Sequence, residues 1–200
     1  MLYKQAHEIA IRCYKELEPF CEKIDIAGSV RREKPEPKDI EIVCQPRLTV
    51  IKDLFQQEVG KHRSYQFCNT VKSLGKILKG HPYEDRYVQI ALPDGINLDL
   101  FMPIPEDYYR QLAIRTGSSM YSHKVLAIAW LNVGYCGTRN GLRLKSECYE
   151  KVIGQRPDGT QKKEWICNVE NPTPPPIFTS EYDFFKFLKM EWVEPSKREI

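Results

Sequence analysis

Three acidic residues stand where the apolar residues around them predict strands. Asp39 and Glu41 alternate with apolar residues in DIEIVC (39–44), and Asp99 lies in NLDLFM (97–102). Because side chains alternate along a strand, the carboxylates of Asp39 and Glu41 point to the same face, about 7 Å apart along the chain. A neighbouring strand can bring Asp99 alongside. Three carboxylates repel one another there, so the pattern predicts a site for Mg²⁺, which prefers oxygen ligands.

Two such ions, about 4 Å apart, can serve an in-line phosphoryl displacement. One ion lowers the pKa of the attacking hydroxyl, and the other stabilises the departing pyrophosphate. We expect the two closest carboxylates to bridge both ions and the third to serve the ion that activates the hydroxyl. Mn²⁺ is expected to substitute for Mg²⁺.

A short apolar run, Ile24–Ala27, ends at Gly28-Ser29, nine residues before the first of these acids. Glycine lets the backbone approach a phosphate closely. A serine hydroxyl and exposed backbone N–H groups donate to phosphate oxygens, and the arginines at 31 and 32 neutralise charge. This segment is therefore predicted to hold a triphosphate.

Composition and charge indicate a soluble intracellular protein that meets a polyanion. The chain has 200 residues and a net charge of +3. Its seven cysteines are odd in number and lack CxxC spacing, which is typical of reduced thiols inside a cell. If the protein is virus-encoded, that cell is the host cell. No apolar run reaches transmembrane length, and the amphipathic N-terminus is no signal peptide. Basic residues outnumber acidic ones between Arg110 and Lys151, which favours contact with nucleic acid or phosphate.

The elements that must position these residues follow from periodicity and turn chemistry. Helices are expected over 2–22, 50–59, 105–114, 119–133 with Gly134 as C-cap, and 180–188 capped by Thr179 or Ser180. Strands are expected over 24–27, 39–44, 70–79, 87–92 and 96–102, and a hairpin over 149–153 and 164–167. Residues 30–37 and the proline-rich 171–176 are expected to be a loop and a linker.

The apolar-Gly-Ser pattern, nine residues and Asp-x-Glu resembles the signature of the nucleotidyltransferase superfamily that includes DNA polymerase beta. Four longer segments resemble the family X DNA polymerases in particular, and they follow in the same order. They are IDIAGSVRRE (24–33), NLDLFMP (97–103), IRTGSSMYSHKVLAIAWLNVGYCGTRNGL (114–142) and SEYDFFKFLKMEWVEPSKRE (180–199).

This resemblance implies an α+β fold in two parts. Residues 1–105 would form a palm-type nucleotidyltransferase domain, a mixed or antiparallel sheet with flanking helices. Residues 106–200 would form a small α/β thumb-like subdomain. The family's N-terminal lyase domain is expected to be missing. The protein is expected to be a monomer that does not associate with membranes.

The resemblance also assigns residues to roles. Asp39, Glu41 and Asp99 would be the catalytic metal ligands, and the pair ahead of the Thr-Gly-Ser motif, Ile114 and Arg115, would occupy the position that gates the sugar. The implied nucleotide-binding residues are Gly28, Ser29, Arg32, Thr116, Gly117 and Ser118. The implied DNA contacts are His123, Lys124, Arg139 and Arg143. The implied partners are a dNTP and a primer-template or gapped DNA duplex.

Several positions depart from the family pattern. The second acid is Glu41 in place of Asp, and Ile114-Arg115 replaces an aromatic pair, which weakens the expected discrimination between ribose and deoxyribose. Ser122 and Leu126 stand where the family presents Asn to the incoming base and Arg to the template. Template-independent nucleotide transfer to RNA ends, a small molecule or a protein therefore remains an alternative to DNA synthesis. An inactive nucleotide-binding or nucleic-acid-binding module is a third.

Overall fold

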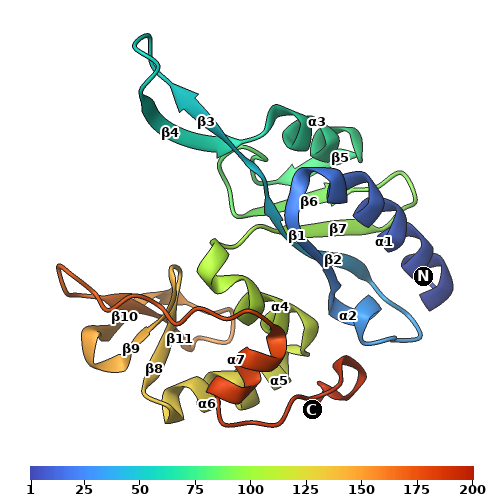
Figure 1. The fold of residues 1–200 in the computed structure, drawn as a ribbon. Helices are drawn as coiled ribbons and strands as arrows, with labels where there is room; N and C mark the ends of the chain where they lie inside the picture. Colours follow the sequence, from blue (N-terminus) through green and yellow to red (C-terminus); the bar gives the residue numbers. More distant parts are fainter.

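A mixed five-stranded sheet carries the N-terminal half of the chain in the computed structural model, which describes residues 1–200 (Figure 1). Helices flank the sheet, so the predicted α+β class is confirmed. Its strands are β1 (Cys21–Ala27), β2 (Asp39–Pro46), β5 (Lys76–Lys79), β6 (Tyr87–Ala91) and β7 (Asn97–Phe101). The helices of this half are α1 (Tyr3–Leu17), a 3₁₀ turn (Glu18–Phe20), α2 (Gly28–Arg31) and α3 (Tyr65–Ser73).

The strand order is β1-β2-β7-β6-β5. Only β2 and β7 pair in parallel, whereas the other neighbours pair antiparallel. The parallel pair lies in the middle of the sheet, and it joins the two segments that carry the acidic residues. The turn at residues 93–95 connects β6 to β7, and Gly95 there has a positive φ of 78°.

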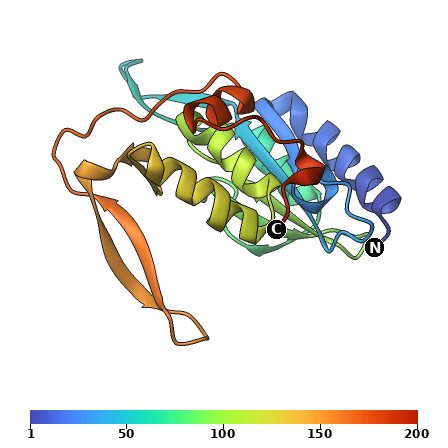
Figure 2. The same cartoon turned by 90° about the horizontal axis from the view of Figure 1, so that it is seen from below.

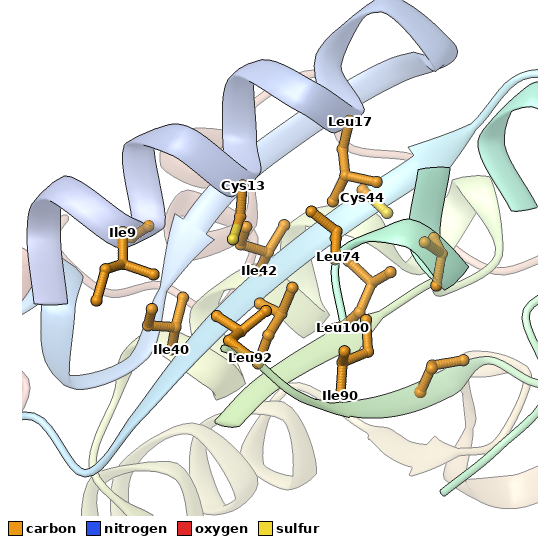
Figure 3. Packing of buried hydrophobic residues seen from close by; sticks show 14 of the residues in the cluster. Ile9, Cys13, Leu17, Ile40, Ile42, Cys44, Leu74, Ile90, Leu92 and Leu100 are labelled. Atoms are coloured by element: carbon orange, nitrogen blue, oxygen red, sulfur yellow. The ribbon is translucent and has the colours of Figure 1, made fainter. Parts of the chain in front are cut away.

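Helices α1 and α3 cover one face of this sheet. Side chains Ile9, Cys13 and Leu17 point from α1 toward β2, where Ile40 and Ile42 are fully buried (Figure 3). The alternation of buried and partly exposed residues along β2 directs its acidic residues to the opposite face. The apolar half of the pattern therefore fixes which way the carboxylates point.

Residues 105–200 build a second, smaller unit below the sheet in Figure 1. Its helices are a 3₁₀ turn (Pro105–Asp107), α4 (Tyr108–Thr116), α5 (Ser119–Tyr121), a π-helical turn (Ser122–Leu126), α6 (Ala127–Asn132), 3₁₀ turns Lys145–Glu147 and Pro195–Lys197, and α7 (Glu181–Phe187). Its strands are β8 (Tyr135–Thr138), β9 (Gly141–Leu144), β10 (Cys148–Gln155) and β11 (Gln161–Cys167). The predicted cap of the last helix is Ser180, whose hydroxyl accepts from the backbone of Asp183 at 3.0 Å.

The two units have separate cores that meet across α4. The larger core lies between α1, α3 and the sheet, and a second one surrounds Trp130 and Phe184. A small cluster joins them, in which Tyr108 and Leu112 of α4 pack against Val43 and Phe101 of the sheet. Its position lets α4 carry side chains toward the face of the sheet that bears the acids.

Two predicted elements are wrong. Residues 50–59, predicted as a helix, belong to a hairpin of β3 (Leu48–Lys52) and β4 (Glu58–Arg63) that extends from the sheet (Figures 1 and 2). The Asp53 carboxylate accepts from the backbone N–H groups of Phe55 and Gln57, and this local turn outweighs the apparent helical spacing. The predicted strand 70–79 is right only for Lys76–Lys79, which form β5. Its first four residues end helix α3, which begins after the N-cap Ser64.

Two further predictions need smaller changes. The expected loop at 30–37 begins in the short helix α2. The first helix ends before residue 22, and Cys21 already belongs to β1. None of the helices has both the length and the apolar character that crossing a bilayer requires.

Candidate active site

The register of β2 and β7 places the three acids on one face of the sheet. Glu41 lies directly opposite Asp99, and Asp39 lies opposite Asn97 two residues earlier. All three acids are partly exposed, whereas Ile40 and Leu98 between them are fully buried on the other face. The structure thus brings together the two segments that the sequence analysis singled out.

Crowding and burial change the acidity of this face. Burial raises the pKa of Glu41 to about 7, and the neighbouring Asp39 acts in the same direction. The pKa of Asp39 is also raised, first by burial and then by Asp99. Like charges that share a low-dielectric surface disfavour one another's ionised forms. The site therefore has a surplus of negative charge that a cation would relieve.

Two neighbours on β6 orient Asp99. The Tyr87 hydroxyl and the Gln89 amide both donate to the Oδ1 atom of Asp99, at 2.9 and 2.8 Å. Oδ2 accepts from no donor in the structure. This arrangement fixes the carboxylate and leaves one oxygen open on the exposed face.

The donor set fits a hard divalent cation, although the side chains are not gathered around one point. No group of three or more Asp, Glu, His or Cys side chains is close enough to form a ready metal cluster. The three acids also take part in none of the ion pairs of the protein. Unpaired carboxylates in register are the ligand type that Mg²⁺ and Mn²⁺ take. Small side-chain movements would be needed to bring them to one ion.

The turn after β1 lies next to the acids. Gly28 has a positive φ of 66°, and a Cβ atom at this position would collide with the Glu41 carboxylate. The Ser29 hydroxyl is buried and has no hydrogen-bond partner. A buried unpaired hydroxyl is uncommon in proteins and is a position where a ligand can bind. Gly28 and Ser29 therefore fit the predicted phosphate-binding turn.

The two arginines of this turn are engaged within the protein. Arg31 donates to Thr116 Oγ1 at 2.7 Å and to both carboxylate oxygens of Glu181. Arg32 donates to the Thr116 carbonyl at 2.6 Å and to Glu199 at 2.9 Å. They connect the turn to the C-terminal unit, so the phosphate contact expected of Arg32 stays a prediction.

The Thr-Gly-Ser motif forms the corner between α4 and α5. Thr116 accepts hydrogen bonds from Arg31 and Arg32. The Ser118 hydroxyl accepts from the backbone N–H of Tyr121 and so caps the N-terminus of α5. A Cβ atom at Gly117 would lie 2.7 Å from the Tyr121 ring. These residues shape the corner in the structure, and their contact with a nucleotide stays a prediction.

The pair ahead of this motif is divided between the two sides of α4. Ile114 packs against the second core. Arg115 faces the acids, and its guanidinium carbon lies 3.9 Å from the centre of the Phe101 ring. Of the two residues expected to gate the sugar, only Arg115 lies where it can meet a ligand at the acids.

The predicted DNA contacts fall at two separate places. His123 and Lys124 are exposed on the π-helical turn. Arg139, in the β8–β9 turn, donates to Glu164 at 2.5 Å, and Arg143 donates to the Thr173 carbonyl at 2.9 Å. Only Arg139 also lines the cleft beside the acids.

A cleft of about 450 Å³ lies between the acidic face and the C-terminal unit, which is room for a nucleotide-sized ligand. Glu41 and Asp99 form part of its wall. The other lining residues are Arg86, Tyr87, Phe101, Pro103, Ile104, Asp107, Gln111, Arg115 and Arg139. A more open hollow of about 520 Å³ includes Ser29, Lys38 and Asp39. The acids therefore separate two spaces that a ligand can enter.

The sequence analysis did not identify Tyr87 and Gln89 as site residues. A signal was present, because a hairpin centred on Asp94 puts residue 89 opposite residue 99.

Comparisons with protein-family models and with curated proteins find no match for this chain.

Proposed function

We propose that the chain is a metal-dependent nucleotidyltransferase that adds a nucleotide from a dNTP to the 3′-hydroxyl of a DNA primer, as family X DNA polymerases do. We infer gap filling or short extension as its reaction. The observation that carries the proposal is the parallel register that aligns Glu41 with Asp99, with Asp39 two residues away on the same face. Carboxylate oxygens that no ion pair occupies are suitable ligands for a two-metal site.

In the proposed reaction, the hydroxyl oxygen bonds to the α-phosphorus and the bond from that phosphorus to the pyrophosphate oxygen breaks. Pyrophosphate leaves, and the hydroxyl proton passes to water. When bound, two Mg²⁺ ions would supply activation of the hydroxyl and charge stabilisation of the leaving group. Asp39, Glu41 and Asp99 would hold them.

The chain's own groups supply orientation. Tyr87 and Gln89 keep Asp99 in one rotamer through hydrogen bonds to Oδ1. The absence of a Cβ atom at Gly28 leaves room for the Glu41 carboxylate beside this turn, and the free Ser29 hydroxyl can donate to a phosphate oxygen. Fixed groups of this kind act by positioning, since phosphoryl transfer needs little covalent chemistry from the protein.

Primer extension tests the proposal. A labelled primer in a gapped duplex is incubated with each dNTP and Mg²⁺ or Mn²⁺, with Asp99→Asn as the inactive control. We expect metal-dependent extension that follows the template and that the control lacks. Absence of any extension with either metal would contradict the proposal.

A second candidate, transfer without a template, is favoured by two positions on the helix after α4. The Ser122 hydroxyl donates to the Ile114 carbonyl at 2.8 Å, and Leu126 is fully buried. Neither side chain is free to contact a base, although these are the positions that meet base and template in the resembling family. The same assay on single-stranded DNA and RNA, with dNTPs and NTPs, separates the two candidates.

A further inference from the structure

Arg115 differs from every other arginine that is not exposed. Its Nε atom is buried and has no partner, and the guanidinium takes part in no ion pair. All other arginines of this kind donate to protein acceptors, namely Arg31, Arg32, Arg63, Arg110, Arg143 and Arg198. Arg110, only five residues earlier, donates three hydrogen bonds, to Asp107 and to the Thr138 carbonyl.

The surroundings of Arg115 hold it in place without using its donors. The guanidinium stacks on the Phe101 ring, a contact that leaves its N–H groups free in the plane of the group. Glu41 and Asp99 share the cleft with it but lie beyond ion-pair distance. Leaving the buried Nε–H group of Arg115 without an acceptor is unfavourable. An acceptor from outside the chain would satisfy it.

We propose that Arg115 binds a phosphate group of the substrate at a subsite in the cleft, separate from the Gly28-Ser29 turn. A guanidinium offers paired donors that match a phosphate. The acids in the cleft would repel a bare anion, whereas a phosphate that arrives with a divalent cation meets them favourably. The phosphate belongs either to the incoming nucleotide or to the strand that carries the hydroxyl. The proposal relies on the proposed function only for these two choices of ligand.

Binding is measured by titration calorimetry with Mg²⁺ present and no turnover possible. One arm uses a dNTP with a methylene bridge between the α- and β-phosphorus atoms. The other arm uses a single-stranded oligonucleotide alone. The variants are Arg115→Gln, Arg115→Lys and, as control, Arg12→Gln, which removes an exposed arginine from α1 on the opposite face of the sheet.

We expect Arg115→Gln to weaken binding about ten- to a hundredfold in the arm that carries the phosphate, because a charge-assisted contact is lost. Arg115→Lys keeps the charge but loses the paired donors. Its affinity should therefore lie between those of Arg115→Gln and the unmodified chain. The control should change affinity less than twofold. If the oligonucleotide arm responds, the slope of log K against log salt should also fall by about 0.7.

Thermal unfolding without ligand separates this role from a structural one. Because Arg115 is unsatisfied in the free protein, Arg115→Gln should unfold at the same or a higher temperature. The proposal is overturned if folded Arg115→Gln binds both ligands within twofold of the unmodified chain. It is equally overturned if Gln and Lys weaken binding alike while both lower the unfolding temperature. A protein that binds through Arg115 but transfers no nucleotide would contradict the proposed function alone.

Discussion

At the scale of single residues, Glu41 is held in an unfavourable state in the ligand-free protein. It is partly buried beside Asp39 and opposite Asp99, and no cationic side chain pairs with it. A protein that needed only stability would have an apolar or amide side chain here. Residues that reduce stability in this way are common at functional sites, where a ligand compensates them.

The unfavourable burial of the Glu41 carboxylate predicts that Glu41→Gln changes the stability of the protein in a pH-dependent way. The folded pKa of about 7 lies above the ordinary 4.5, so the unfolded chain releases this proton first and stability falls as pH rises between these values. Glu41→Gln removes the penalty, which is at most about 1–3 kcal/mol because the group is partly solvated. Thermal unfolding should therefore favour the variant near neutral pH and above, and the two proteins should converge near pH 4. A variant less stable than the unmodified chain at about pH 8 would contradict this interpretation.

At the scale of elements, the join between β1 and α2 connects the acids to the proposed phosphate turn. Gly28 has a left-handed backbone conformation, and the Glu41 carboxylate occupies the space where a side chain would lie. Backbone conformation and close approach thus both require glycine here.

Gly95 provides a matched control for Gly28. It also has a positive φ, 78°, but a Cβ atom there would meet nothing. Gly95→Ala should cost only the backbone strain, about 1 kcal/mol. Gly28→Ala should cost clearly more in thermal unfolding and should reduce nucleotide transfer, because the carboxylate must move. Equal unfolding temperatures for the two variants would show that the Glu41 contact is unimportant.

The strands that carry the acids could be predicted from the sequence, whereas the hairpin at residues 48–63 could not. Strict alternation in residues 39–42 and 97–100 identified the strands and the face of their acids. The hairpin at residues 48–63 was not predicted because its strands are exposed on both faces. Their sequences therefore lack the alternation of apolar and polar residues that marks a half-buried strand. Arg115 could not be interpreted from sequence, since its burial against Phe101 depends on how α4 packs on the sheet.

At the scale of the whole molecule, Glu181 connects the two units. It accepts two hydrogen bonds from Arg31 of α2 and two from Arg198 of the C-terminal tail. Burial alone would raise the pKa of Glu181, but the two arginines outweigh burial and the pKa is lowered. The buried carboxylate thus holds α2, α7 and the tail together.

Glu181→Gln should destabilise the protein strongly at neutral pH. Breaking a buried ion pair on one side costs about 3–5 kcal/mol, because the arginines remain buried with too few acceptors. Since the folded pKa is lowered, the contribution of Glu181 is present above about pH 4.5 and is lost as pH falls. The difference between variant and unmodified chain in thermal unfolding should shrink on acidification.

Glu199→Gln is the control for this prediction. Glu199 pairs with Arg32 and Lys34 but is more exposed, so its loss should cost about 1 kcal/mol or less. If both substitutions had the same small effect, Glu181 would not be the link between the units.

The proposed function requires that Asp39, Glu41 and Asp99 form one two-metal catalytic site. The most direct test is the rate of single-nucleotide insertion with Mg²⁺ for the unmodified chain and for Asp39→Asn, Glu41→Gln and Asp99→Asn, with folding checked by circular dichroism. Loss of one ligand should remove about 4 kcal/mol or more of transition-state stabilisation, so each folded variant should be at least about a thousandfold slower. A folded variant that inserts nucleotides at a rate close to that of the unmodified chain would contradict the assignment.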